Sequence, residues 1–81
     1  MKEKVTFNFS RLEGLIKQHY DTQEKFAEAI PMARSTLNQK LNNHIVFDSN
    51  DIYHIIKALD IKMEDVGDIF FSTENSENRI E

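Results

Sequence analysis

Apolar residues recur at helical spacing along most of this chain, in segments too short to be stable one by one. In the clearest of these segments, the apolar side chains stand at positions i, i+3, i+4 and i+7: Ile52, Ile55, Ile56 and Leu59. This spacing places all four on one face of a helix. Because isolated helices shorter than about 12–15 residues are marginal in water, several of them must share one core. The pattern therefore predicts an all-α fold, a compact single domain of five short helices.

Capping signals indicate where the first two helices begin and end. Ser10 is followed three residues later by Glu13, which is the form of a capping box, so the first helix is expected to start at Ser10. Thr22 is a suitable N-cap for the second helix. Pro31 should end that helix, because proline cannot continue a helix interior.

The remaining helices follow from similar signals. A third helix is expected from about residue 34 to residue 42, with its two leucines inward, and Asn43 can end it because Asn tolerates the left-handed conformation. Either Asp48 or Ser49 can cap the fourth helix. The apolar face of the fifth helix consists of Met63, Val66, Ile69 and Phe70.

The two ends of the chain have a different character. Residues 1–9 are expected to form an N-terminal arm, in which the alternating residues 5–9 are either a short strand or an extended segment. Residues 10–71 form the helical domain. Residues 72–81 are polar, acidic and unpatterned, and are expected to be a flexible tail.

Several apolar residues do not fit a single buried face. Phe70 and Phe71 are adjacent, so both cannot face one core from the same helix. One of them is a candidate for a dimer or partner surface. The same holds for residues 45–47, three apolar residues in a predicted loop.

Composition excludes several classes of function. The 81 residues contain no cysteine and no apolar run of membrane-spanning length, so neither a disulfide scaffold nor a membrane span is expected. The three histidines are scattered, and no motif defines a nucleophile or a metal site. We therefore expect a protein that is not an enzyme, carries no cofactor or metal, and works in the reducing cytoplasm.

The third predicted helix differs in charge from the rest of the chain. The formal net charge is −4, yet residues 1–60 are balanced, and the acidic excess lies in residues 61–81. Residues 31–47 contain Arg34, Lys40 and His44 and no acidic residue. A surface that meets the phosphates of DNA would have this local charge, because an acidic side chain there would be repelled.

Two short helices joined by a short turn are typical of a helix-turn-helix, whose second helix enters the major groove. Arg suits the acceptors of guanine, and Asn and Gln suit the donor and acceptor of adenine. Arg34, Asn38 and Gln39 are of these types, and Ser35 and Thr36 can bond to bases or phosphates. Lys40 is a further candidate DNA contact on the same predicted helix.

The segment "TQEKFAEAIPMARSTLNQKLNN" resembles the helix-turn-helix of the lambda-repressor/Cro (Xre) family, and the similarity covers about residues 10–71. The whole chain is similar to small Cro-like switch regulators of phages and prophages of low-GC Gram-positive bacteria. The resemblance implies that Gln23 holds a phosphate and supports Arg34. It also implies that Arg34, Ser35, Asn38 and Gln39 face bases. It places three residues near the DNA backbone: Asn42, Asn43 and His44.

Two positions depart from the family pattern. Pro31 stands where the family usually has glycine, and Ala33 stands where a Ser or Thr usually caps the third helix. Either Ala33 is the N-cap, with Arg34 as the first helical residue, or Ser35 is the N-cap and the register shifts.

Two functions from different classes are compatible with the sequence. The first is a Cro-like transcriptional repressor that binds operator DNA through the third helix, as a homodimer on a two-fold site in the bacterial host cell. The second is an antirepressor or modulator that acts by binding a partner repressor protein. The acidic last quarter of the chain and the predicted exposed phenylalanine favour the second.

Overall fold

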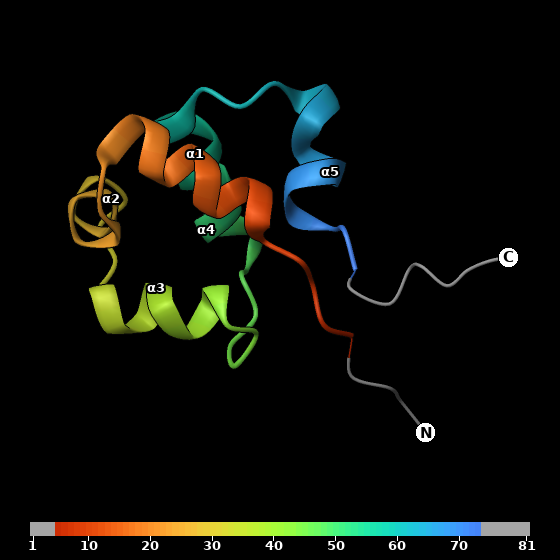
Figure 1. The fold of residues 1–81 in the computed structure, drawn as a ribbon, viewed down its shortest axis with the longest axis horizontal. Coiled ribbons are helices and arrows are strands. Elements are labelled where there is room, and N and C mark those ends of the chain that lie inside the picture. The colour runs from red at the N-terminus through yellow and green to blue at the C-terminus, as the bar shows by residue number, and fades with distance from the viewer. Residues whose placement is uncertain (1–4, 74–81) are drawn as a thin grey trace, which may run out of the picture.

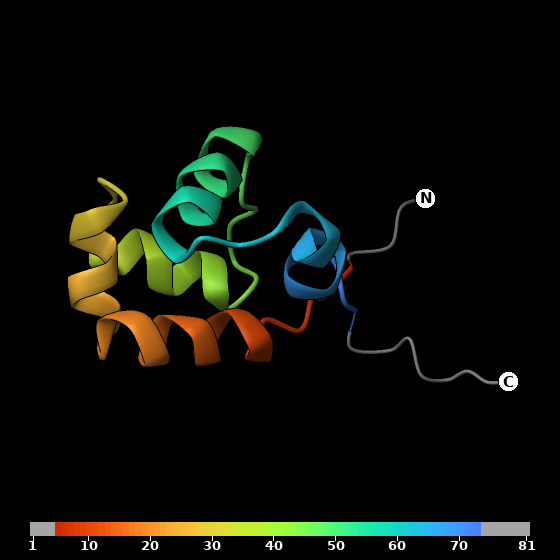
Figure 2. The same ribbon diagram turned by 90° about the horizontal axis from the view of Figure 1, so that it is seen from above.

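The computed structural model describes residues 5–73, and in this part of the chain it confirms the all-α prediction (Figures 1 and 2). The elements are α1 (Ser10–Tyr20), α2 (Gln23–Ala29), α3 (Arg34–Leu41), α4 (Ser49–Leu59), a 3₁₀ turn η1 (Met63–Asp65) and α5 (Val66–Phe70). Within residues 5–73, extended pairing is limited to an isolated antiparallel bridge between Phe7 and Thr73. The N-terminal residues are therefore an extended arm rather than a strand of a sheet.

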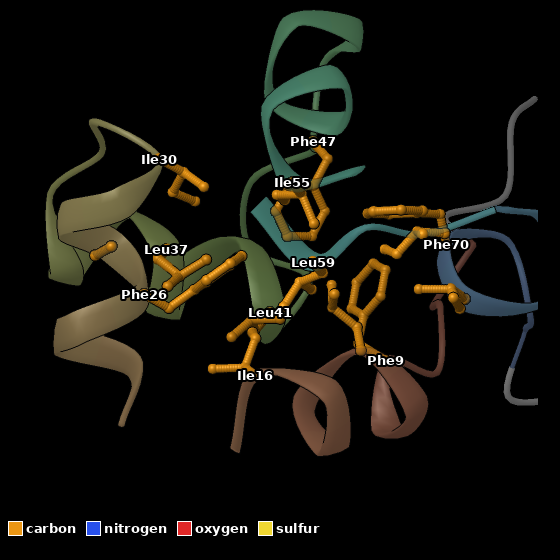
Figure 3. Packing of buried hydrophobic residues seen from close by; sticks show 14 residues of the cluster. Phe9, Ile16, Phe26, Ile30, Leu37, Leu41, Phe47, Ile55, Leu59 and Phe70 are labelled. Atoms are coloured by element: carbon orange, nitrogen blue, oxygen red, sulfur yellow. The ribbon is translucent and has the colours of Figure 1, made fainter. Parts of the chain in front are cut away.

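One hydrophobic core joins all five α-helices. Each helix contributes its inward apolar face, and Phe9, Ile30, Phe47 and Ile61 add to the core from the connecting segments. Figure 3 shows these side chains converging between α1, α3 and α4, with Phe70 entering from α5. The largest side chains that are fully buried are Phe26, Leu12, Leu37, Ile55 and Ile69.

The helix starts confirm one capping prediction and overturn another. The Thr22 side chain accepts a hydrogen bond from the Lys25 N–H at 3.1 Å, as an N-cap does. The predicted capping box at Ser10 is wrong, because Ser10 is already the first residue of α1 and the N-cap is Phe9, without a side-chain hydrogen bond. Instead, the Asn8 side chain accepts from the Ser10 N–H at 2.9 Å.

The connection between α2 and α3 decides the register of α3. Ala33 is the N-cap, with an extended backbone (φ −66°, ψ 142°) and no capping side chain, and Arg34 is the first helical residue. The alternative start at Ser35 is therefore excluded. Pro31 in this turn has a φ of 20°, away from the −65° that its ring favours, so the turn is strained there. Asn43, just after α3, has the predicted left-handed conformation with a φ of 67°.

The C-terminal part of the domain departs from the single helix predicted for residues 63–70. A 3₁₀ turn precedes α5, so residues 63–70 do not form one continuous α-helix. Met63 was expected in the core, but it is exposed. Of the expected tail, Ser72 and Thr73 lie beside the arm, with the Asn8 N–H donating to the Ser72 carbonyl at 2.7 Å. Residues 74–81 lie outside the described residues.

Candidate functional site

The polar face of α3 is exposed as the sequence predicts. Arg34, Ser35, Asn38 and Gln39 are exposed, while Thr36 is half-buried. The part of α3 that faces solvent therefore carries one permanent positive charge and no negative charge. The interpretation of α2 and α3 as a DNA-reading helix-turn-helix stays a prediction.

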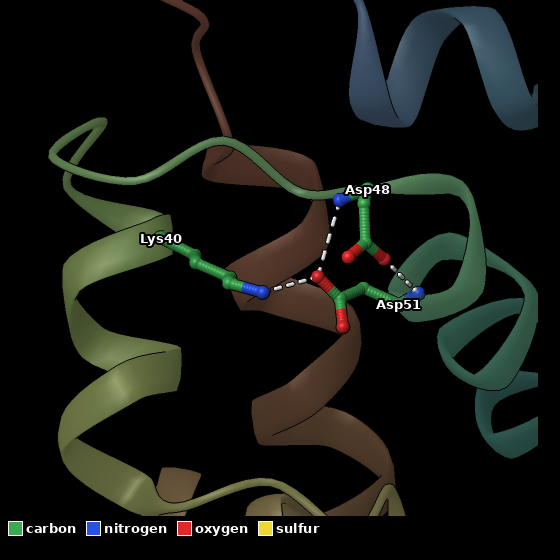
Figure 4. Close-up of polar contacts among 3 residues, drawn as sticks. All are labelled: Lys40, Asp48 and Asp51. Carbon is green, nitrogen blue, oxygen red and sulfur yellow. Dashed lines mark hydrogen bonds and ion pairs between the residues drawn. The ribbon is translucent and has the colours of Figure 1, made fainter.

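Lys40 does not belong to this exposed face. Lys40 is 8% exposed as a whole residue, and its ammonium group forms an ion pair with the carboxylate of Asp51 on α4 (Figure 4). Lys40 lies three residues after Leu37 and one before Leu41, both buried, so helical spacing places it on the inward side. We therefore remove Lys40 from the candidate DNA contacts. The spacing was visible in the sequence, but the carboxylate that holds the ammonium group was not.

The ion pair also completes the N-terminus of α4. Asp48 and Asp51 form a capping box, in which the Asp48 side chain accepts from the Asp51 N–H at 2.8 Å and the Asp51 side chain accepts from the Asp48 N–H at 3.1 Å. Burial by itself would raise the pKa of Asp51. Hydrogen bonds from Lys40 and from the Asp48 backbone, together with the charge of Lys40, outweigh burial and hold this pKa below its ordinary value.

The residues after α3 are used in two ways. Asn42 is exposed, and its amide donates to the Asn38 carbonyl at 2.8 Å, inside the same helix end. His44 is also exposed. The Asn43 side chain forms two hydrogen bonds with the arm: its Oδ1 accepts from the Phe7 N–H at 2.8 Å, and its Nδ2 donates to the Phe7 carbonyl at 2.9 Å. Asn43 is therefore not free to approach a DNA backbone in this conformation.

Gln23, which the family resemblance assigns to a phosphate, is the first residue of α2 and is half-buried. Three charged residues of the same helix are exposed: Glu24, Lys25 and Glu28. The exposed charges of α2 therefore sum to −1.

A second candidate surface is an apolar groove of about 300 Å³ between the arm, the loop after α3 and the end of α5. Its lining comprises Val5, Phe7, Phe9, Lys40, Asn43, Ile45, Val46, Phe47, Ile52, Phe70 and Phe71. Four large apolar side chains at this groove are exposed: Val5, Ile45, Val46 and Phe71. An exposed apolar group of this kind is typical of an interaction site.

Ring contacts connect the surface of this apolar groove to the core. The Phe7 ring lies edge-on to the Phe71 ring, with 6.1 Å between centroids, and 6.0 Å from the Phe9 ring. The Phe9 ring in turn lies edge-on to the Phe47 ring, with 5.2 Å between centroids. The Phe47 ring lies edge-on to the Phe70 ring, with 6.0 Å between centroids. The prediction for the phenylalanine pair is confirmed, since Phe70 is buried and Phe71 is exposed. The contribution of Val5 and Phe7 to the apolar groove was missed, although the alternation of residues 5–9 indicated a two-faced segment.

Among residues 5–73, no group of three or more His, Cys, Asp or Glu residues is placed to hold a metal ion. The described helices include none with the length and apolar character needed to cross a membrane.

Comparison with known proteins shows the family to which this protein belongs. A family model described as "Protein of unknown function (DUF739)" matches residues 5–73, and the chain belongs to this family. Among solved structures, the chain is similar to the modulator of repression (MOR) of the temperate bacteriophage TP901-1 from Lactococcus lactis, known from a solution structure. The identity is 27%, the match covers 82% of this chain and 89% of the other, and the TM-score is 0.72. No curated protein sequence matches the chain significantly. These matches do not extend to the lambda-repressor/Cro family that the sequence resembles.

Proposed function

We propose that this protein is a phage-type transcription regulator that acts by binding a repressor protein, and that the apolar groove is its docking surface. The observation that carries the proposal is the exposure of Val46 (79%) and Phe71 (55%) at one groove. Exposing apolar side chains to water is unfavourable by about 25 cal/mol for each Å² of apolar surface. A protein partner that covers them recovers that energy. The similarity to a modulator of repression supports the same conclusion.

The charge distribution also favours a protein partner over DNA. DNA binders neutralise phosphates with Lys and Arg side chains, and these contacts supply a large share of their affinity. On α3, Lys40 is already neutralised by Asp51, which leaves Arg34 as the permanent cation of the exposed face. With so few cations, we expect DNA affinity to be weak.

The proposal is tested by calorimetric titration of the full-length protein with the purified repressor encoded in the same phage or prophage. Val46→Asp places a charge in the apolar groove and should weaken binding at least tenfold, because a buried unpaired charge is costly. Met63→Asp is the matched control, since Met63 is 76% exposed but does not line the apolar groove. If the two variants bind alike, the assigned docking surface is wrong. If the wild-type protein does not bind the repressor, the proposed function is wrong.

A second candidate function is operator binding, and the exposed, acid-free face of α3 favours it. Under this alternative, Arg34 and Gln39 contact base edges, and the protein works as a homodimer on a two-fold site. Arg34→Ala and Gln39→Ala should each then cost about 1–3 kcal/mol in DNA binding and relax specificity at one base position. Fluorescence anisotropy with the DNA next to the gene, at two salt concentrations and against unrelated DNA, decides between the two functions. Tight, sequence-selective and strongly salt-dependent binding would support the second.

A further inference from the structure

We infer that Asn43 is a positioning residue for the apolar groove, because its amide holds the extended arm against the end of α3 so that Val5 and Phe7 form one wall. The inference rests on the proposed function, in which this groove binds a partner. Figure 1 shows the arm descending from α1 between the loop that follows α3 and the end of α5.

The contact between Asn43 and the arm imitates one step of a β-ladder. The Asn43 amide accepts from the Phe7 N–H at 2.8 Å and donates to the Phe7 carbonyl at 2.9 Å, although the two residues are 36 positions apart. On its other side, the arm pairs with residues 72 and 73. The arm is therefore bonded from both sides, and the side chain of Asn43 takes the place of a strand.

Three requirements at position 43 explain why the residue is Asn. The backbone has a φ of 67°, which Asn tolerates better than most residues with a side chain. The side chain must also offer a donor and an acceptor at the same time, as an amide does. Finally, it must be short, because the arm lies close to the end of the helix. Glycine tolerates the backbone conformation but has no amide side chain, and Asp lacks the donor.

The consequence for the apolar groove follows from the position of Phe7. The Phe7 ring contacts Phe71, whose exposed ring lines the same groove. Without the Asn43 amide, both polar groups of the Phe7 backbone lose their hydrogen-bond partner, and the backbone pairing of the arm that remains is the one with residues 72 and 73. Phe9, which follows in the arm, is buried in the core and keeps the start of α1 in place.

The test compares the full-length protein with its Asn43→Gly variant, which preserves the positive φ and removes the amide. We expect hydrogen exchange of the Phe7 amide, measured by NMR, to become at least tenfold faster, and contacts between the Phe7 and Phe71 rings to weaken. We also expect affinity for the repressor encoded in the same phage or prophage to fall at least tenfold. Thr22→Ala, which removes the N-cap of α2 away from the arm, is the control for a general loss of stability and should leave that affinity unchanged.

Each outcome bears on the inference in a defined way. An unchanged rate of hydrogen exchange at the Phe7 amide in Asn43→Gly would overturn the inference, whatever the affinity of this variant for the repressor. Faster exchange with unchanged repressor affinity would overturn it as well, while the proposed function would stand. An equal loss of affinity in Thr22→Ala would show that stability, not position, is responsible. Absence of binding by the wild-type protein would overturn the proposed function and the inference together.

Discussion

The ammonium group of Lys40, near the end of α3, is paired with the carboxylate of Asp51 in the first turn of α4, and both side chains are largely buried (10% and 13% exposed). The pair connects two helices at the point where the chain between them, residues 42–48, makes a loop. It also removes one of the few positive charges of α3 from the surface. The same contact therefore stabilises the fold and restricts what the exposed face of α3 can bind.

Breaking this pair should destabilise the protein. Lys40→Met leaves the Asp51 carboxylate buried without its counter-charge, a change that typically costs about 3–5 kcal/mol. Because Asp51 keeps its hydrogen bond from the Asp48 backbone, we expect about 3 kcal/mol in the free energy of unfolding, measured with urea. The double variant Lys40→Met/Asp51→Asn should lose less than the sum of the two single variants. Additive losses would contradict a direct interaction.

The ion pair predicts a loss of stability in acid. The pKa of Asp51 in the folded protein lies below its ordinary value of 3.8, so the unfolded chain takes up the proton more readily. The contribution of Asp51 is therefore fully present above about that value and is lost as pH falls through the folded pKa. Thermal unfolding between pH 2 and pH 6 should show a decline at the acidic end that is smaller in Asp51→Asn. Lys40→Met should also reduce the decline, because Lys40 is a cause of the lowered pKa. A slope identical in all three proteins would be inconsistent with this assignment.

The start of α3 offers a stabilising substitution. Ala33 has the backbone conformation of an N-cap but no side chain that can accept a hydrogen bond from the first turn. Ala33→Ser supplies this acceptor and should raise the free energy of unfolding by about 1 kcal/mol. Ser10→Ala is the informative comparison, because Ser10 matches a capping box in sequence but does not cap α1. Urea unfolding should show a gain for the first variant and little change for the second. A marked loss in Ser10→Ala would mean that Ser10 does cap α1.

Local signals predicted the helices well. The spacing of Ile52, Ile55 and Leu59 identified α4, and Thr22 marked the start of α2. These signals act within one or two helical turns, so they can be recognised from the order of residues alone. The exposure of one phenylalanine in the pair 70–71 followed in the same way, because adjacent residues of a helix cannot share a face.

The surfaces, in contrast, were decided by contacts between distant parts of the chain. Lys40 and Asn43 have the residue types of a DNA-binding surface, and the sequence analysis assigned them to one. In the folded protein, Lys40 is held by a carboxylate 11 residues away, and Asn43 by a backbone 36 residues away. No local sequence pattern identifies such partners, because they depend on how α1, α3 and α4 pack together. The sequence by itself determined the helices and their buried faces, whereas tertiary packing decided which polar and apolar groups remain free to bind a partner.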